Sequence, residues 1–209
     1  MIPLLQKSIS MPKGDLTMPA TEPIRSKSDL RSMSTYFKLR GQFRNNAMIV
    51  LGAHTALRIS DLLPLTWSDV YDSHSGKFRK RFTIREGKTK KMRTVTLHPK
   101  AVEALALLFE HRREDSTYIF ASNRRDGRAI SRIQAWRIIH NAVEALHISG
   151  VVAPHSLRKT FGYHAAVEES MSPVLLMEIY NHSSFEVTKR YLGLRQEELD
   201  GAYLSVSLF

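Results

Sequence analysis

Asn181-His-Ser-Ser-Phe-Glu-Val-Thr-Lys-Arg-Tyr191 is a segment in which a tyrosine follows a histidine by nine residues. Upstream the chain reads Pro154-His-Ser-Leu-Arg158, and before that Thr55-Ala-Leu-Arg58-Ile-Ser-Asp61. A tyrosine needs a base or nearby cations to become a nucleophile, and attack on a phosphodiester needs cations around the phosphate. In this order the three segments indicate phosphodiester chemistry through a covalent phosphotyrosine.

The overall charge agrees with a nucleic-acid partner. The chain has 209 residues, and its 31 Lys and Arg against 20 Asp and Glu give a formal net charge of +11 and a pI near 10.0. Such an excess favours a polyanion, with nucleic acid ahead of an anionic membrane surface. A basic solubilising surface is the other explanation, and charge alone does not separate the two.

Composition excludes several other classes of protein. The absence of cysteine rules out disulfides, thiolate metal sites and a cysteine nucleophile. The apolar start Met1-Ile-Pro-Leu-Leu is too short for a signal peptide, and the apolar region 47–57 is too short to span a membrane. We therefore expect a cytoplasmic protein without a membrane partner.

Two parts of the chain differ in pattern. Residues 1–27 carry four prolines and no periodicity, which predicts a flexible N-terminal arm, whereas residues 28–209 read as one mainly helical domain. Residues 80–97 interrupt the helices with two alternating segments around a glycine-bearing basic turn, which predicts a β-hairpin. The helices are expected near residues 28–37, 44–56, 60–63, 99–110, 131–146, 155–168, 173–181, 185–191 and 196–204.

Arg58 and Arg158 are the candidate phosphate clamp. An arginine binds two oxygens with its planar fork and stays charged, which suits the charge that develops on the phosphoryl oxygens. Asp61 follows Arg58 by one helical turn, so it can orient the guanidinium. A purely structural Arg–Asp pair explains that spacing equally well.

Two histidines and the tyrosine complete the candidate set. His155 lies one turn before Arg158 and can take the tyrosine proton or bond the phosphate, and His182 can donate to a phosphate oxygen. A surface histidine or a loop histidine is the alternative for each. Of the seven tyrosines, only Tyr191 combines a basic approach with a nearby histidine.

The hairpin turn supplies the candidate general acid. Lys88 can protonate the departing 5′ oxygen, while Lys90 and Lys91 are rivals because a turn can present any of them. Solvated charge is the plain alternative for all three. We find no metal-ligand spacing and no nucleotide-binding glycine loop, so no metal and no cofactor are predicted.

Together these motifs resemble the catalytic domain of tyrosine recombinases, the phage-integrase family, over about residues 24–205. Asn181 stands where the family has glycine, and an Asn tolerates the left-handed backbone. The resemblance implies a mainly α fold with a small β-hairpin (α+β), of the DNA breaking-rejoining type. It also implies catalytic roles for Arg58, Lys88, His155, Arg158, His182 and Tyr191, with Asp61 in support.

The function implied is that of a site-specific DNA recombinase or integrase that cuts and rejoins DNA through a 3′-phosphotyrosine, without metal or ATP. Double-stranded DNA is the implied partner, with a tetramer on paired sites and a monomer when free. Accessory DNA-bending proteins are a further class of partner that the resemblance implies, and it implies an origin in a bacterium, a phage or a mobile element. Residues 1–27 are too short for the family's core-binding domain, which we expect to be absent. A type IB topoisomerase-like enzyme and a non-catalytic DNA-binding module derived from a recombinase are the alternatives.

Overall fold

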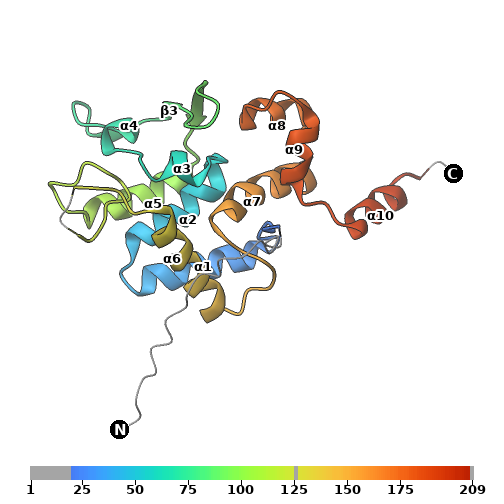
Figure 1. Ribbon diagram of the computed structural model, residues 1–209, viewed down its shortest axis with the longest axis horizontal. Helices are drawn as coiled ribbons and strands as arrows, with labels where there is room; N and C mark the ends of the chain where they lie inside the picture. Colours follow the sequence, from blue (N-terminus) through green and yellow to red (C-terminus); the bar gives the residue numbers. More distant parts are fainter. Residues whose placement is uncertain (1–19, 125–126, 208–209) are drawn as a thin grey trace, which may run out of the picture.

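The computed structural model describes residues 20–124 and 127–207, and it is built mainly of helices (Figure 1). The predicted mainly helical fold with one hairpin is confirmed. The helices are α1 (Lys27–Leu39), α2 (Phe43–Thr55), α3 (Ile59–Leu62), α4 (Trp67–Val70), α5 (Pro99–Glu110), α6 (Arg132–Ala145), α7 (Pro154–Val167), α8 (Pro173–Tyr180), α9 (Phe185–Leu192) and α10 (Gln196–Ser205).

Local chemistry explains where these helices begin. The Asp29 backbone N–H donates to the Ser26 hydroxyl before α1, and Ser131 and Gln134 form a reciprocal capping box at α6. Helices α5, α7 and α8 each carry a proline in the first turn, where its missing N–H costs no hydrogen bond. The termini could therefore be predicted to within a residue or two.

The predicted hairpin consists of β3 (Arg81–Arg85) and β4 (Met92–Thr96), antiparallel, with Thr83 opposite Thr94. Phe82 and Val95 face the core from neighbouring positions, which is why the sequence alternates. Three further elements were not predicted: α4, and a two-residue ribbon of β1 (Tyr71–Asp72) and β2 (Lys77–Phe78). Segments this short carry no periodicity that could reveal them.

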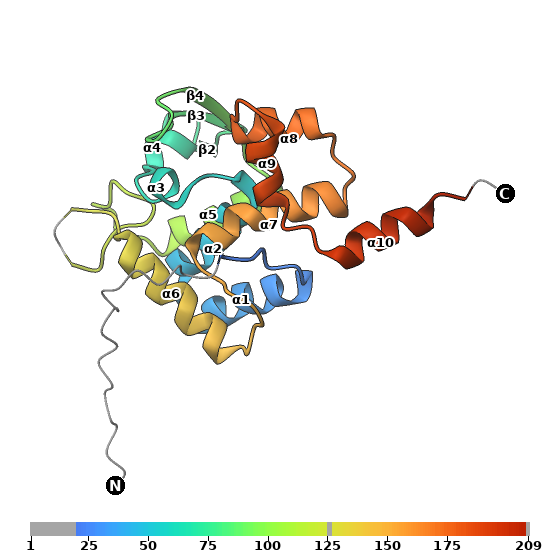
Figure 2. The same cartoon turned by 45° about the vertical axis from the view of Figure 1, so that its right-hand side comes forward.

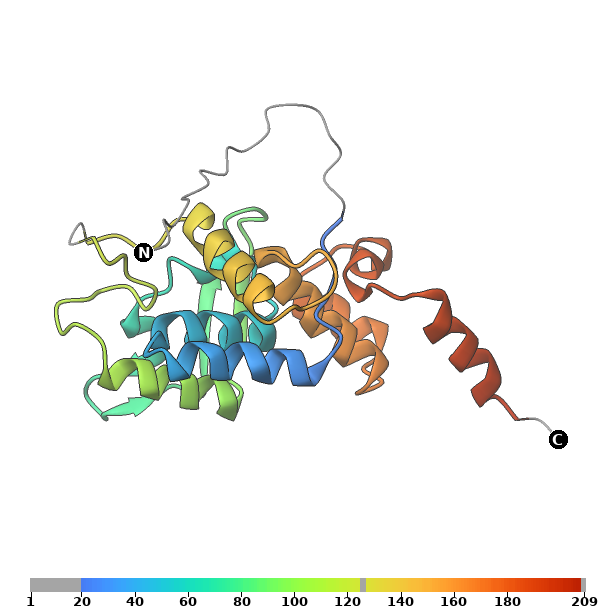
Figure 3. The same ribbon diagram turned by 90° about the horizontal axis from the view of Figure 1, so that it is seen from below.

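Most buried apolar side chains form one main core around α2, which packs against α1, α5 and α7 (Figure 3). A separate C-terminal cluster contains Ala56, Ala165, Leu176, Tyr180 and Leu192, and it lies where α7, α8 and α9 meet. Figure 2 shows α8 and α9 beside the β3–β4 hairpin, with α10 extending away from the body.

Helices α6 and α10 both expose apolar side chains. On α6, Ile133 is 55% exposed, and the side chains buried there are Ala135, Ile139 and Ala142. The stripe of α10 faces solvent, because Tyr203 and Leu204 are more than four-fifths exposed. Periodicity identifies an amphipathic helix but not the partner that covers it.

The predicted N-terminal arm falls mostly outside the described residues. Its last part, residues 20–26, lies across α7: the Ile24 backbone N–H donates to Thr160, and the Lys159 ammonium group donates to the Thr21 carbonyl. We call residues 21–26 the strap. No helix within residues 20–124 and 127–207 is long and apolar enough to cross a membrane.

Candidate active site

Arg58 lies at the start of α3, directly after the left-handed turn that ends α2. Its side chain is largely buried, and Nη1 lies 3.1 Å from the Glu86 carboxylate but 4.0 Å from that of Asp61. Asp61 instead accepts a 2.9 Å hydrogen bond from the Gly87 backbone N–H. The predicted Arg58–Asp61 pair is therefore present, but its nitrogen–oxygen distance is at the upper limit for an ion pair. The main contact of Asp61 is with the hairpin.

Glu86 is the acidic centre of this side of the site, and the sequence motifs did not identify it. Its side chain is fully buried and pairs with two arginines, Arg58 and Arg93, the latter at 3.5 Å. The Thr89 hydroxyl donates to it at 2.6 Å, and the Asn181 side-chain amide donates at 3.5 Å. One carboxylate thus connects the first arginine, the hairpin turn and the segment that leads to His182.

Electrostatics keep Glu86 ionised. Burial alone would raise the pKa of the Glu86 carboxyl, but the Thr89 hydrogen bond and the guanidinium groups of Arg58 and Arg93 outweigh it and hold this pKa below its ordinary value. Glu86 is the single acidic residue between Asp72 and Glu103, in a stretch rich in Lys and Arg. That isolation is the sequence signal that could have drawn attention to it.

Arg158 projects from the first turns of α7 and is completely buried. Its Nη1 donates to the Ala56 carbonyl, and its Nη2 donates to the Tyr180 carbonyl at 3.1 Å and to His182 Nε2 at 3.0 Å. Burial, followed by the charges of Arg58 and Arg93, lowers the pKa of Arg158 to about 10, so the group remains a cation at neutral pH. Arg158 joins the end of α2 to the end of α8.

The backbone conformation of Ala56 is uncommon, and it allows Arg158 to connect α2 with α8. Its φ of 52° is left-handed, a conformation that costs an alanine roughly 1 kcal/mol. The turn directs the Ala56 carbonyl to the guanidinium groups of both Arg93 and Arg158. A strained residue that receives two buried cations is typical of a functional site.

His182 follows a second left-handed turn. Asn181 ends α8 with φ 56°, as expected for an asparagine in the place of glycine. The His182 ring stacks on Tyr180, with centroids 5.1 Å apart and planes 10° apart, and its Nδ1 lies 3.0 Å from the Thr188 hydroxyl. Burial, then the charges of Arg158 and Arg58, lowers the pKa of His182 to about 4, so the ring is neutral at pH 7.

Tyr191 lies on α9, in contact with three other groups of the site. Its ring centroid is 5.0 Å from that of His182 and 5.2 Å from that of His155, and the Arg158 guanidinium carbon is 5.1 Å from it. Burial, then the charge of Arg158, lowers the pKa of His155 to about 4. A neutral imidazole beside a tyrosine can accept its proton.

Gly162 allows α7 to approach α8 and α9 this closely. A Cβ at this position would lie 2.4 Å from the Tyr180 hydroxyl and 3.1 Å from the Tyr191 carbonyl oxygen. The Tyr180 hydroxyl in turn donates to the Arg158 carbonyl at 2.7 Å. A side chain on Gly162 would therefore displace both the buried Tyr180 and the backbone of Tyr191.

Lys88 lies exposed on the β3–β4 turn. Its charge is among those that lower the pKa of His155. All six predicted catalytic residues thus approach one region. Glu86, Arg93, Tyr180 and Thr188 also contribute to it. Apart from the isolation of Glu86 among basic residues, nothing in their spacing distinguished them from ordinary core or surface residues.

No group of three or more His, Asp or Glu side chains within residues 20–124 and 127–207 could hold a metal ion. The cationic groups of the site are Arg58, Arg93, Arg158 and Lys88. Such an arrangement can bind and polarise an anionic phosphodiester through guanidinium and ammonium groups.

The sequence pattern of the phage integrase family matches residues 26–198. Among curated proteins, a Bacillus subtilis protein named "Probable integrase/recombinase YoeC" is 34% identical over 189 residues, which cover 89% of this chain and 97% of that protein. "Tyrosine recombinase XerD" of Mycobacterium tuberculosis is 32% identical over 71% of this chain. The chain spans about half the length of this XerD relative, 47%.

Solved structures share the fold. The crystal structure of XerA recombinase matches with a TM-score of 0.70 and 24% identity, over 93% of this chain and 66% of that one. XerH site-specific recombinase, in a post-cleavage complex with a palindromic difH substrate, matches with a TM-score of 0.69 and 18% identity, over 90% of this chain and 54% of that one. The predicted fold is therefore confirmed.

Proposed function

The chain belongs to the phage integrase family of tyrosine recombinases, which cut and rejoin DNA, and from this premise we propose that Tyr191 is its nucleophile in site-specific recombination. The observation that carries the proposal is the convergence of Arg158, His155 and His182 around the Tyr191 ring, with centroid distances of 5.0 to 5.2 Å. This set holds both a cation for the phosphate and a neutral base for the phenol.

In the proposed reaction, Arg58, Arg158 and His182 hold the scissile phosphate. The Tyr191 oxygen attacks phosphorus, its proton passes to His155, and a 3′-phosphotyrosine bond forms as the bond to the 5′ oxygen breaks. Lys88 gives its proton to that leaving oxygen. A 5′-hydroxyl of the partner strand then reverses the steps, so the bond energy is conserved and no nucleotide is consumed.

Lys88 is preferred over its two neighbours as the general acid. Its charge acts on His155, so the lysine belongs to the same site as the residue that takes the tyrosine proton. The Lys90 backbone is left-handed, with φ 61°, and its N–H donates to the Glu86 carbonyl. This contact ties the turn around Glu86 and is consistent with a fixed orientation of Lys88.

We infer that DNA binding assembles several copies, through α10. In that helix no residue is buried, Tyr203 and Leu204 are exposed, and Glu197 and Asp200 make it acidic. An apolar, acidic helix that extends from the body requires a partner with an apolar surface and positive charge. A second copy of this chain offers such a surface.

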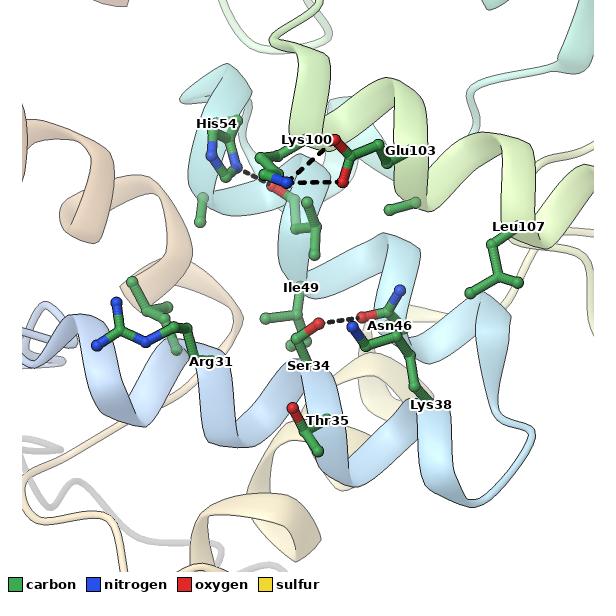
Figure 4. Close-up of a pocket in the computed structure, with 14 residues that line it drawn as sticks. Arg31, Ser34, Thr35, Lys38, Asn46, Ile49, His54, Lys100, Glu103 and Leu107 are labelled. Atoms are coloured by element: carbon green, nitrogen blue, oxygen red, sulfur yellow. Dashed lines mark hydrogen bonds and ion pairs between the residues drawn. The ribbon is translucent and has the colours of Figure 1, made fainter.

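The receiving surface is the groove of about 520 Å³ between α1, α2 and α5 (Figure 4). Ile49, Val50 and Leu107 give it an apolar lining, and Arg31 and Lys38 stand along α1 beside it. The charge of the groove is thus complementary to that of α10. Tyr203→Asp is expected to reduce the mass of the DNA-bound complex in sedimentation while the free protein stays folded; an unchanged mass would contradict this docking.

The catalytic proposal is tested by trapping protein covalently joined to DNA in cells that express the wild type, Tyr191→Phe or the matched control Tyr118→Phe. We expect adducts at one or a few loci for the wild type and the control, and none for Tyr191→Phe. An adduct that persists in Tyr191→Phe would assign the nucleophile elsewhere. Scattered adducts would indicate a topoisomerase-like activity, and none in any variant a DNA-binding module.

A further inference from the structure

The two ring nitrogens of His182 have different partners, and together these fix its tautomer. Nε2 lies 3.0 Å from Arg158 Nη2, and Nδ1 lies 3.0 Å from the Thr188 hydroxyl oxygen. An arginine can only donate, so Nε2 must accept. The ring proton is therefore on Nδ1 and is donated to Thr188. The lowered pKa of His182 agrees with a neutral ring.

This tautomer is the wrong one for binding a phosphate. A phosphate oxygen accepts hydrogen bonds, and it would take the Arg158 N–H that Nε2 now accepts. The lone pair of Nε2 would then face an anionic oxygen, which is repulsive. His182 can stabilise the phosphate only if Nε2 carries the proton.

Rotation of the ring is not an easy solution. The imidazole is stacked on the buried Tyr180 ring and lies 5.0 Å from the Tyr191 ring, so a flip would have to break two aromatic contacts. Moving the proton between the two nitrogens leaves every heavy atom in place. That exchange needs a partner at Nδ1 that can change from acceptor to donor.

We propose that Thr188 is a positioning residue that reverses its hydrogen bond to His182 when the scissile phosphate enters. A hydroxyl can both accept and donate, so it accepts from Nδ1–H in the free protein and donates to Nδ1 in the complex. Nε2 takes a proton from water and Nδ1 loses its own proton to water, so the ring is neutral before and after. This inference rests on the proposed function, because it assumes that His182 meets the phosphate.

The surroundings of Thr188 suit this role. The residue is completely buried on α9, three positions before Tyr191, so its hydroxyl is held against the ring. The charged groups that act on His182 are Arg158, Arg58, Arg93 and Glu86, and the carboxylate of Glu86 opposes the arginines. Thr188 is the neutral partner among them.

Nitrogen NMR of ¹⁵N-histidine-labelled Tyr191→Phe reads the tautomer directly. In the free protein we expect a protonated Nδ1 on His182. With a duplex that carries a cleavage site recovered by adduct sequencing, we expect the signal of a protonated Nε2. A protonated Nε2 already present in the free protein, or an unchanged Nδ1–H or a doubly protonated ring in the complex, would overturn the proposal.

Kinetics provide the second test. Thr188→Val keeps the shape of the side chain but removes the hydroxyl, and we expect adduct formation in a single turnover to slow roughly 10- to 100-fold, with DNA affinity unchanged. Thr188→Ser should restore the rate to within a few fold. Thr160→Val, which changes another buried threonine outside the reacting groups, is the matched control and should keep the wild-type rate.

A double-mutant cycle separates positioning from general packing. In a His182→Ala background, Thr188→Val should have little further effect, because the partner that it orients is already absent. A full additional loss in that background, or a wild-type rate for Thr188→Val alone, would overturn the proposal. The wild type is measured alongside the Thr188 variants. If it forms the adduct while the Thr188 variants behave otherwise than expected, the role of Thr188 is wrong but the catalytic assignment of Tyr191 stands.

Discussion

The main core and the C-terminal cluster are stabilised in different ways. The main core is apolar and extends from Ile24 to Leu157, through α1, α2, α5, α6 and the hairpin. In the described part of the chain, the C-terminal cluster has five buried apolar side chains, including Tyr180 and Leu192. Polar contacts supplement these few apolar contacts, chiefly the hydrogen bonds that Arg158 donates to the Ala56 and Tyr180 carbonyls.

The proposed catalytic residues are divided between these two regions. Arg58 is attached to the main core, whereas His182 lies between the short helices α8 and α9 of the C-terminal cluster and Tyr191 lies on α9. Elements with few buried apolar contacts open locally at lower free energy than the core does. We therefore expect the nucleophile to be carried by the more easily displaced part of the domain, and Glu86 and Arg158 to align it with the first arginine.

The largest effect is expected from Glu86→Gln, which breaks the contact between the two regions. The variant leaves Arg58 and Arg93 buried without their carboxylate, and loss of one partner of a buried ion pair typically costs about 3–5 kcal/mol. Urea unfolding measures this loss. Adduct formation should fall as well, since Arg58 loses the carboxylate that holds it.

Glu103→Gln is the matched control for that change. It neutralises a glutamate whose 2.9 Å ion pair with Lys100 is exposed to solvent on both sides, so its effect should stay below about 1 kcal/mol. Equal effects of the two substitutions would show that Glu86 is not a structural connection between the regions.

Gly162→Ala tests how tightly the C-terminal cluster is packed. The added methyl group would meet Tyr180 and the Tyr191 backbone, and overpacking of this kind costs roughly 1–3 kcal/mol. We expect a larger loss in adduct formation than in stability, because the nucleophile itself moves. Gly201→Ala, in open space on α10, is the control and should stabilise that helix by about 1 kcal/mol or less. An active Gly162→Ala would mean that α9 can shift freely.

The same contrast explains what the sequence could predict. The hairpin and the long helices of the main core repeat with a clear period because one side of each is buried, so they were predicted closely. The residues that connect the two regions follow no period. Glu86 receives its importance from the fold, which brings Arg58, Arg93 and Asn181 to it from distant parts of the chain.

Candidate site residues were predictable for a different reason. Arg58, Arg158, His182 and Tyr191 occur in short motifs whose order is characteristic, and the fold brings them together. Thr188 lies within the last of these motifs but resembles any threonine in a helix. Only in the folded structure does its hydroxyl lie within hydrogen-bond distance of the Nδ1 of His182.

Acid should weaken the C-terminal cluster before the main core. His155 and His182 have pKa values of about 4 when folded and 6.5 in the ordinary state, so between these values the unfolded chain binds protons that the folded chain excludes. Stability therefore falls as the pH is lowered from about 6.5 towards 4. After allowance for partial exposure, we expect on the order of 1 kcal/mol for each histidine between pH 7 and pH 5.

Urea unfolding at the two pH values measures this effect, and the double substitution His155→Gln, His182→Gln should remove most of it. His54, half-buried at the end of α2 beside the main core, also has a pKa lowered by burial and contributes to the remainder. A pH dependence unchanged in the double variant would place the responsible histidine in the main core and reverse the comparison.

The smallest effect is expected from a change in the strap (residues 21–26). It contacts residues 193–195 between α9 and α10, which we call the hinge. The Glu22 carboxylate accepts hydrogen bonds from Arg25 and Arg195, at 2.8 and 2.7 Å, and Arg25 also donates to the Gly193 carbonyl. These groups are partly exposed, so Glu22→Gln should change the free energy of unfolding by less than about 1 kcal/mol.

The informative measurement for this variant is hydrogen exchange along α10. Because no residue of α10 is buried, its position depends on the hinge and on the hydrogen bond from Tyr163 to Glu198. Glu22→Gln should therefore speed exchange in α10 several fold and leave the helices of the main core unchanged. Exchange that stays slow would mean that Tyr163 alone holds the helix. Faster exchange throughout the domain would mean that the strap supports the main core as much as the nucleophile helix, so the two regions would not be separable at this edge.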